Sequence, residues 1–284
     1  MSLTLSKPHA RIGDERQGTT TQAGRYADSL KGKIMRTSFG PLLALTFFTI
    51  ATPAFAGDTD PPPSVTVSGG VTVVSDYRFR GISQTDKRFA VQGTVTVASK
   101  TGLYATVWGS SIDDYVFNGA DQEIDLSAGY KKSFGGAAVD VGVLYYYYPG
   151  SGGIDSDFFE PYASVSYTFG PVTAKGSAAY APKQSALRVI PGFSKKEDNL
   201  YVAGDLSGGI PNTPISLSAH IGHNFGPSYL SIGKEYTDYS IGASVTRKNV
   251  TIGVQSVDPD GDFITPSGRN ASKGGVVFSL GATF

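Results

Sequence analysis

Polar and apolar residues alternate along strand-length segments from Ser64 to the last residue, Phe284. A period of two places alternate side chains on opposite faces of a β-strand. In the final segment one face is apolar and the other is small and polar: Val276, Phe278, Leu280, Ala282 and Phe284 against Ser279, Gly281 and Thr283. The chain is therefore predicted to be all-β, although a soluble sandwich would show the same alternation.

Twelve strands are predicted, and their connections fall into two classes. Connections after even-numbered strands are short, and those after odd-numbered strands are longer. Short turns at one end, long loops at the other and an even strand count are the layout of an outer-membrane barrel. A C-terminal Phe is also typical of such barrels. We therefore predict a transmembrane antiparallel up-and-down β-barrel with strands at 64–82, 89–98, 103–112, 121–131, 136–148, 157–169, 172–182, 197–208, 215–225, 235–247, 249–258 and 274–284.

The two faces of the predicted strands differ in polarity, as a membrane barrel requires. One strand, for example, directs Leu126 and Ala128 toward lipid and Glu123, Asp125 and Ser127 inward. The lipid-facing residues at the ends of several strands are aromatic, as expected for the girdle at a membrane interface. They are Tyr130, Tyr167, Phe169 and Phe225.

The N-terminal region has the features of an export signal. Basic residues precede an apolar run at 39–50, and the small-residue pattern Ala54-Phe55-Ala56 follows. This order predicts a signal peptide over 35–56, cleaved between Ala56 and Gly57. A membrane anchor is the alternative, but the run is shorter than the ~20 residues that span a bilayer.

The domain organisation follows from this leader. Residues 1–34 show no hydrophobic periodicity and are predicted to be a mis-called start, with Met35 as the true one, or a disordered extension. Residues 57–284 are predicted to form the barrel, and the expected location is the bacterial outer membrane.

Removing the leader changes the charge of the chain. The full sequence has 24 basic and 24 acidic residues; residues 1–56 hold seven and three of them, which leaves 17 and 21. A net charge near −4 argues against nucleic acid as a partner. The absence of cysteine excludes disulfides and thiolate metal sites. No cofactor is predicted.

The stretch 71–85 is the most distinctive local sequence. In the first predicted strand the odd-numbered residues face lipid and the even-numbered residues face the lumen. If this alternation continues, Tyr77 and Phe79 face lipid, and the charged side chains point into the lumen: Asp76, Arg78 and Arg80. A charge on the lipid face would cost about 2–4 kcal/mol at mid-bilayer, so this assignment is required if the segment is a membrane strand.

The same stretch resembles a known family. The sequence SDYRFRGISQT at 75–85 is similar to the TorF-type porins of proteobacteria, also known as the Gcw_chp family. The resemblance continues at Ala90–Gly93, Gly102–Tyr104, Val107–Ser110, Glu123–Leu126 and Val139–Gly150. It covers most of the mature chain and implies an outer-membrane barrel with a pore role, without supplying a substrate.

The predicted lumen carries charges of both signs: Asp76, Glu123, Asp125, Asp140, Glu160 and Asp205 against Arg78, Arg80, Arg88 and Lys175. Opposite charges that face each other across a pore screen solutes by charge. The candidate selectivity residues are Asp76, Arg78, Arg80, Glu123, Asp125 and Lys175. The alternative is a salt-bridged network that fills the interior, with Arg78 and Arg80 clamped to Asp76, Glu123 or Asp125 across the wall.

Aromatic residues are also expected inside the lumen, where they could stack on sugar rings: Tyr104, Trp108, Tyr146, Tyr148, Tyr162 and Tyr201. The run Tyr145–Tyr148 places aromatics on both faces of one strand, so packing together with a girdle is the simpler interpretation.

The histidines and the aspartates of 258–262 give weaker indications. His220 and His223 are three residues apart, which directs them to opposite faces of a strand. His223 with Asn224 is the one visible start of a catalytic site. The aspartates lack the spacing of an EF-hand loop and are interpreted as a turn.

Three functions remain open at this point. The leading hypothesis is a porin, not an enzyme, that sits in the lipid bilayer beside lipopolysaccharide and passes small hydrophilic solutes. The alternatives are a lipid-modifying outer-membrane enzyme, and a structural or surface-recognition barrel without an open pore. Nothing in the sequence indicates an oligomeric state.

Overall fold

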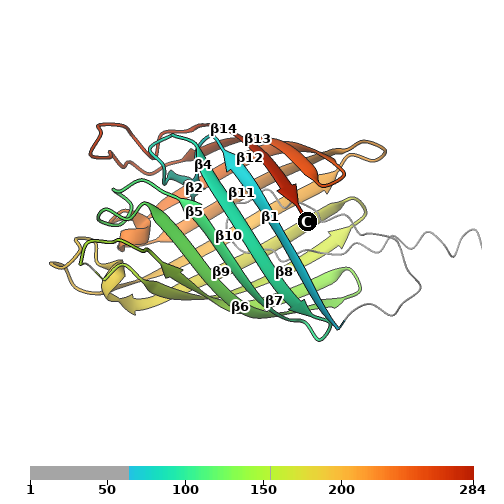
Figure 1. The fold of residues 1–284 in the computed structure, drawn as a ribbon, viewed down its shortest axis with the longest axis horizontal. Coiled ribbons are helices and arrows are strands. Elements are labelled where there is room, and N and C mark those ends of the chain that lie inside the picture. Colours follow the sequence, from blue (N-terminus) through green and yellow to red (C-terminus); the bar gives the residue numbers. More distant parts are fainter. Residues whose placement is uncertain (1–63, 154) are drawn as a thin grey trace, which may run out of the picture. The chain divides into compact units, whose positions relative to one another are not determined.

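The computed structural model describes residues 64–153 and 155–284, and these residues form a closed antiparallel barrel of twelve strands (Figure 1). Each barrel strand pairs with its neighbours in sequence, and β1 pairs with β14 to close the ring. The predicted fold class and strand count are confirmed. The predicted extension, signal peptide and cleavage position at 1–34, 35–56 and Ala56–Gly57 lie outside the described residues.

The barrel strands are β1 (Val65–Val74), β4 (Ala90–Ser99), β5 (Leu103–Ser111), β6 (Gln122–Phe134), β7 (Ala137–Tyr147), β8 (Phe158–Phe169), β9 (Val172–Gln184), β10 (Glu197–Gly209), β11 (Ile215–Phe225), β12 (Tyr236–Arg247), β13 (Val250–Pro259) and β14 (Gly275–Thr283). A separate two-stranded sheet consists of β2 (Arg78–Phe79) and β3 (Ile82–Ser83). Two short 3-10 helices, η1 (Ser185–Leu187) and η2 (Tyr229–Ser231), lie in loops. No helix in 64–153 or 155–284 is long and apolar enough to cross a membrane.

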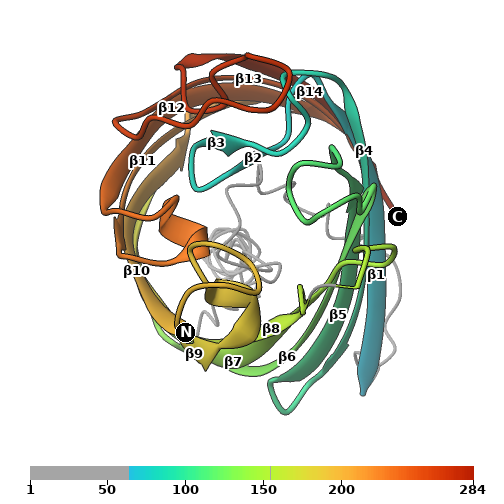
Figure 2. The ribbon, with the colours of Figure 1, turned by 90° about the vertical axis from the view of Figure 1, so that its left-hand side faces the viewer.

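The connections are sorted by length as predicted. Short turns follow β4, β6, β8, β10 and β12, and longer segments follow the other barrel strands. All the short turns therefore lie at one end of the barrel, which we call the short-turn end, and all the longer segments lie at the long-loop end. The ring formed by the strands is seen end-on in Figure 2.

The outer and inner faces of the wall differ as the alternation predicts. Large apolar side chains are exposed on every barrel strand, among them Leu126, Leu217 and Ile241, whereas Glu123 and Asp125 point inward and are buried. The predicted girdle residues are also exposed: Tyr130, Tyr167, Phe169 and Phe225. An apolar surface of this extent cannot face water without association.

The first predicted strand, 64–82, is wrong beyond Val74. β1 ends there, and the chain turns into the ring to form the β2–β3 hairpin (Figure 2). Tyr77, which the parity directed toward lipid, is only 2% exposed, and Phe79 packs against the buried apolar cluster. The predicted orientation of Tyr77 and Phe79 was wrong because an alternating sequence is equally compatible with one straight strand and with a hairpin.

Candidate functional site

A tight turn at Arg80-Gly81 makes the inward-folded hairpin possible. Both residues have positive φ, 46° and 82°, which is the conformation of a two-residue type I′ turn. A Cβ on Gly81 would lie 2.8 Å from Cβ of Asp238 on β12, so glycine also allows the turn to pack closely against the wall. The tip of the hairpin thereby reaches the inner face of β12.

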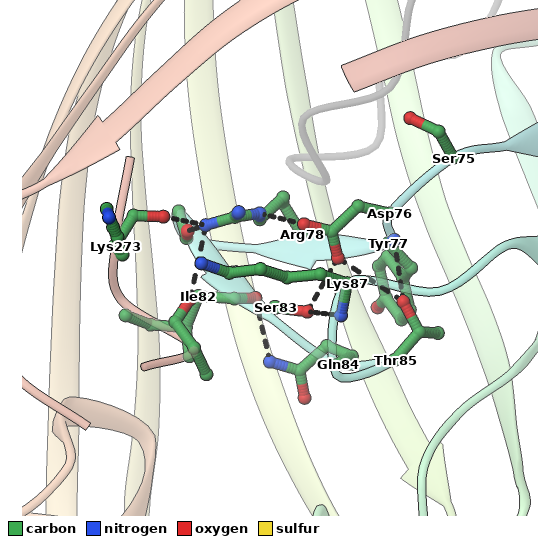
Figure 3. A network of polar contacts seen from close by, with 12 residues as sticks. Ser75, Asp76, Tyr77, Arg78, Ile82, Ser83, Gln84, Thr85, Lys87 and Lys273 are labelled. Atoms are coloured by element: carbon green, nitrogen blue, oxygen red, sulfur yellow. Dashed lines mark hydrogen bonds and ion pairs between the residues drawn. The ribbon is translucent and has the colours of Figure 1, made fainter. Parts of the chain in front are cut away.

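The stem of the hairpin is fixed by Asp76 and Arg78 (Figure 3). Arg78 Nε donates to Asp76 Oδ2 at 2.6 Å, and Nη1 donates to the carbonyls of Gly81, Ala271 and Lys273. Asp76 Oδ1 accepts from Ser83 Oγ at 2.6 Å. Burial and the nearby guanidinium of Arg78 lower the pKa of Lys87 in the same loop. Arg78 is thus held by structural partners on the hairpin and the β13–β14 loop.

Arg80 makes different contacts, because it extends from the tip to the inner faces of β8, β10 and β11. Its Nη2 donates to both oxygens of Glu160 on β8, at 2.6 and 2.8 Å. Nη1 donates to Asn199 Oδ1 on β10 at 2.8 Å and lies 3.4 Å from Asn224 Oδ1 on β11. The guanidinium also lies over the Tyr201 ring, 4.4 Å from its centroid. We call this set of contacts the Arg80 latch.

Two apolar clusters occupy the long-loop end of the lumen. The larger one gathers aromatic residues of the barrel wall and the loops, including Trp108, Phe117, Tyr146, Tyr148 and Phe158. The smaller one consists of Ile82, Tyr236 and Ala271, with Ile232 and Phe263 packed against them. Of the six predicted inward aromatics, all are buried, and the close stacking of Tyr146 on Phe158 shows packing within the protein.

Glu123 and Asp125 lie on the inner face of β6, two residues apart, but have unequal surroundings. Glu123 accepts from the hydroxyls of Tyr77 and Tyr148, at 3.1 and 3.2 Å. Both carboxyl oxygens of Asp125 are buried without a hydrogen-bond partner among the described residues. Of the three predicted partners for the arginines, Asp76 is observed, paired with Arg78, whereas Arg80 pairs with Glu160 and neither arginine pairs with Glu123 or Asp125.

A second polar network runs along the inner faces of β9 to β12. Lys175 Nζ lies 3.3 Å from Asp205 Oδ2, and Asp205 Oδ1 lies 2.7 Å from Nδ1 of His220. The other ring nitrogen, Nε2, lies 3.0 Å from Asp238 Oδ2. The Tyr201 hydroxyl donates to Asp238 Oδ1 at 2.9 Å. Since Arg80 lies over Tyr201, this network meets the Arg80 latch.

Most of these charges could be placed inside the lumen from the alternation, but several of their partners could not. Asp238, Asn199 and Asn224 were not identified as members of a polar network, and His220 was given no carboxylate to orient it. Two carboxylates in fact flank its ring. One of them could have been found once strands were assigned, because Asp205 is the direct register partner of both Lys175 and His220.

The structure does not bring His223 and Asn224 together as a catalytic site. Asn224 points inward, is fully buried, and donates to the carbonyl of Leu230 at 2.6 Å. His223 lies on the other face, where its ring contacts Phe225 edge-on and its Nδ1 lies 3.0 Å from Thr237 Oγ1. Adjacent residues of one strand face opposite sides of the wall, so these two groups cannot act on one substrate.

Solved structures with the same architecture identify the class of fold. The KdgM porin in complex with disordered oligogalacturonate aligns with a TM-score of 0.50 at 8% identity, over 77% of this chain and 98% of that chain. A chain from a study of the in-meso crystallization of membrane proteins aligns with a TM-score of 0.51 at 11% identity, over 77% and 83%. At these identities the likeness shows the fold alone, a porin-type β-barrel.

The family is shown by the sequence itself. The model of a family described as bacterial protein of unknown function, Gcw_chp, matches residues 58–284, and the chain belongs to this family. The Gcw_chp part of the resemblance at 75–85 is therefore confirmed. No curated protein matches the sequence.

Proposed function

We propose that the protein is an outer-membrane channel of the porin type that passes small hydrophilic solutes. The observation that carries this proposal is a closed barrel with an apolar outer wall and a charged inner wall. An apolar exterior suits a bilayer, and polar side chains inside a barrel suit the passage of water-soluble molecules. The pore activity implied by the resemblance to TorF-type porins, and contact with lipopolysaccharide, belong to the same proposal.

The inner charges would then select solutes according to their sign. Among the residues named from the sequence, Lys175 lies in the network of β9 to β12, away from the apolar clusters. Asp76, Arg78, Arg80, Glu123 and Asp125 lie at the long-loop end, in or beside the packed hairpin. We therefore assign selectivity in the open channel mainly to Lys175 and the network around it.

Conductance in planar lipid bilayers tests the proposal directly. Purified protein from the outer membrane should give discrete current steps, with a reversal potential in a salt gradient that depends on charged lumen residues. Protein unfolded by boiling, inserted from the same detergent, is the control. If neither the native protein nor a variant with a loosened hairpin conducts, the channel proposal fails.

The enzyme alternative finds less support in the geometry. His220 carries a carboxylate on each ring nitrogen, and carboxylates only accept hydrogen bonds, so both nitrogens must donate and neither is free to act as a base. A barrel that acts through its loops would show no conductance in any variant, which separates it from the channel.

A further inference from the structure

We propose that the β2–β3 hairpin is a gate, and that the Arg80 latch holds it in the closed position. This inference rests on the proposed channel function. It adds that the hairpin moves and that the contacts of Arg80 keep the channel closed. Opening would create a hydrophilic path at the position of the Arg80 latch, because the polar partners of Arg80 lie between the two apolar clusters.

The hairpin can move without breaking the barrel. β2 and β3 pair with each other and, among the described residues, with no barrel strand. Isolated two-stranded hairpins are marginally stable in water, so this one depends on its surroundings for its position. Movement of the hairpin would leave every wall-to-wall hydrogen bond of the twelve-stranded ring intact.

The hairpin is attached differently at its two ends. The stem is held by Arg78, which binds two carbonyls of the β13–β14 loop, and by the backbone bond from Ser83 N to the carbonyl of Ala271. These partners are on the same side of the ring as β1. The tip packs at Gly81 against Asp238 and Pro259, and the side chain of Arg80 ties it to Glu160 on the far side. Loss of the Arg80 contacts would remove the tie across the ring and leave the tip with packing contacts alone, while the stem stays in place.

The latch lies among polar side chains between the two apolar clusters at the long-loop end of the lumen. We call Glu160, Asn199 and Asn224 the polar seam. Arg80 stacks on Phe79, which packs against the larger cluster, at 4.8 Å from the ring centroid. Its partner Asn224 is the register partner of Tyr236, a member of the smaller cluster. Glu160, Asn199 and Asn224 would remain as a hydrophilic lining once Arg80 had left. Water can replace the hydrogen bonds of such groups, whereas it cannot replace apolar packing.

The polar network on β9 to β12 extends from the seam toward the short-turn end of the barrel. Tyr201 lies beneath the Arg80 guanidinium, and its hydroxyl leads through Asp238 and His220 to Asp205. The side chain of Asp205 is 28% exposed, the most accessible acid of this network. A solute admitted at the seam would meet a continuous series of polar groups.

Two readouts test the gate, one electrical and one chemical. The chain has no cysteine, so a single Ile82→Cys substitution gives one thiol beside the tip, at a position that is buried in the parent structure and outside the contacts of Arg80. The variants are Arg80→Ala, Arg80→Lys and Glu160→Gln. The matched control is Arg247→Ala, an exposed arginine at the short-turn end of β12. Each variant must show the heat-dependent gel shift of a folded barrel.

We expect Arg80→Ala and Glu160→Gln to raise mean conductance by roughly fivefold or more. Labelling of the introduced thiol by a hydrophilic reagent should become faster by about tenfold or more, because local opening exposes it. Arg247→Ala should change neither readout, and Arg80→Lys should fall between.

Each other outcome overturns one part of the argument. Unchanged labelling and unchanged current in the folded latch variants would overturn the gate. Faster labelling with no current in any protein would support a movable hairpin and overturn the channel. If Arg80→Ala does not fold, Glu160→Gln alone decides, because it preserves the shape of the side chain and removes its charge.

Discussion

Asp205 and His220 face each other directly across β10 and β11, with 2.7 Å between the carboxylate Oδ1 and the ring Nδ1. Asp238 takes the second ring nitrogen, so the imidazole is held between two acids. The two acids differ in exposure: the side chain of Asp205 is 28% exposed and that of Asp238 only 1%. The same histidine thus links a buried acid to one that the lumen can present to solutes.

This difference predicts which acid controls ion selectivity. In the open channel, Asp205→Asn should shift the reversal potential toward anion selectivity, because it removes the accessible negative charge beside Lys175 and His220. Asp238→Asn should shift it less, since that carboxyl does not reach the solvent. The measurement is the reversal potential in a salt gradient across a planar bilayer. Equal shifts in the two variants would contradict the prediction.

The buried pair of Arg80 and Glu160 predicts a coupled loss of stability. Removing one member of such a pair costs about 3–5 kcal/mol if the other charge stays buried, and opening of the hairpin to water would relieve part of that cost. Arg80→Ala and Glu160→Ala should each lower the free energy of unfolding in detergent by up to this amount, and the double variant should cost far less than the sum. Lys195→Ala serves as the control. The side chain of Lys195 is exposed in its ion pair with Glu197, and such a pair contributes little to stability. Additive losses would show that the two residues do not stabilise each other.

Tyr201 predicts a steric requirement at one glycine. A Cβ on Gly222 would lie 1.9 Å from the Tyr201 hydroxyl oxygen, so the tyrosine covers that glycine across the strands. Gly222→Ala should destabilise the barrel by about 1–3 kcal/mol, because the ring must move and lose its bond to Asp238. Gly93→Ala is the matched control, since no described atom lies within 4 Å of a Cβ built there. Both losses can be measured from chemical unfolding, and equal values would count against this steric role.

Export makes a further prediction that concerns residues before the barrel. N-terminal sequencing of the protein from the outer membrane should begin at Gly57, because the pattern Ala54-Phe55-Ala56 follows an apolar segment. Translation begun at Met35 should yield the same mature protein. Retention of residues before Met35 in the mature protein would disprove the proposed leader.

The barrel itself could be predicted because its constraints act on single strands. Leu126 and Glu123 must face opposite environments, and a period of two in the sequence is enough to report this. The length of each connection is also a local property. Both features can be recognised without knowledge of any contact between distant residues, and the structure confirms them.

The interior could not be predicted in the same way. Arg80 lies 80 residues before Glu160 in sequence, and nothing near either residue specifies the other. Gly81 did carry a local indication, because a glycine within a strand-like run suggests a turn or a close approach of backbone. The alternation of Tyr77 and Phe79 masked it, since both residues fit a lipid-facing row and a hairpin equally well.

The closure of the ring has a consequence for biosynthesis. β14 supplies partners to both β13 and β1, and Phe284 exchanges two backbone hydrogen bonds with Gly69. A polypeptide that stops before Gly275 would leave two strand edges open in an environment that offers them no hydrogen bonds. Closure of the ring therefore depends on β14, and a chain that lacks this strand cannot form the continuous hydrogen-bonded wall that a bilayer requires.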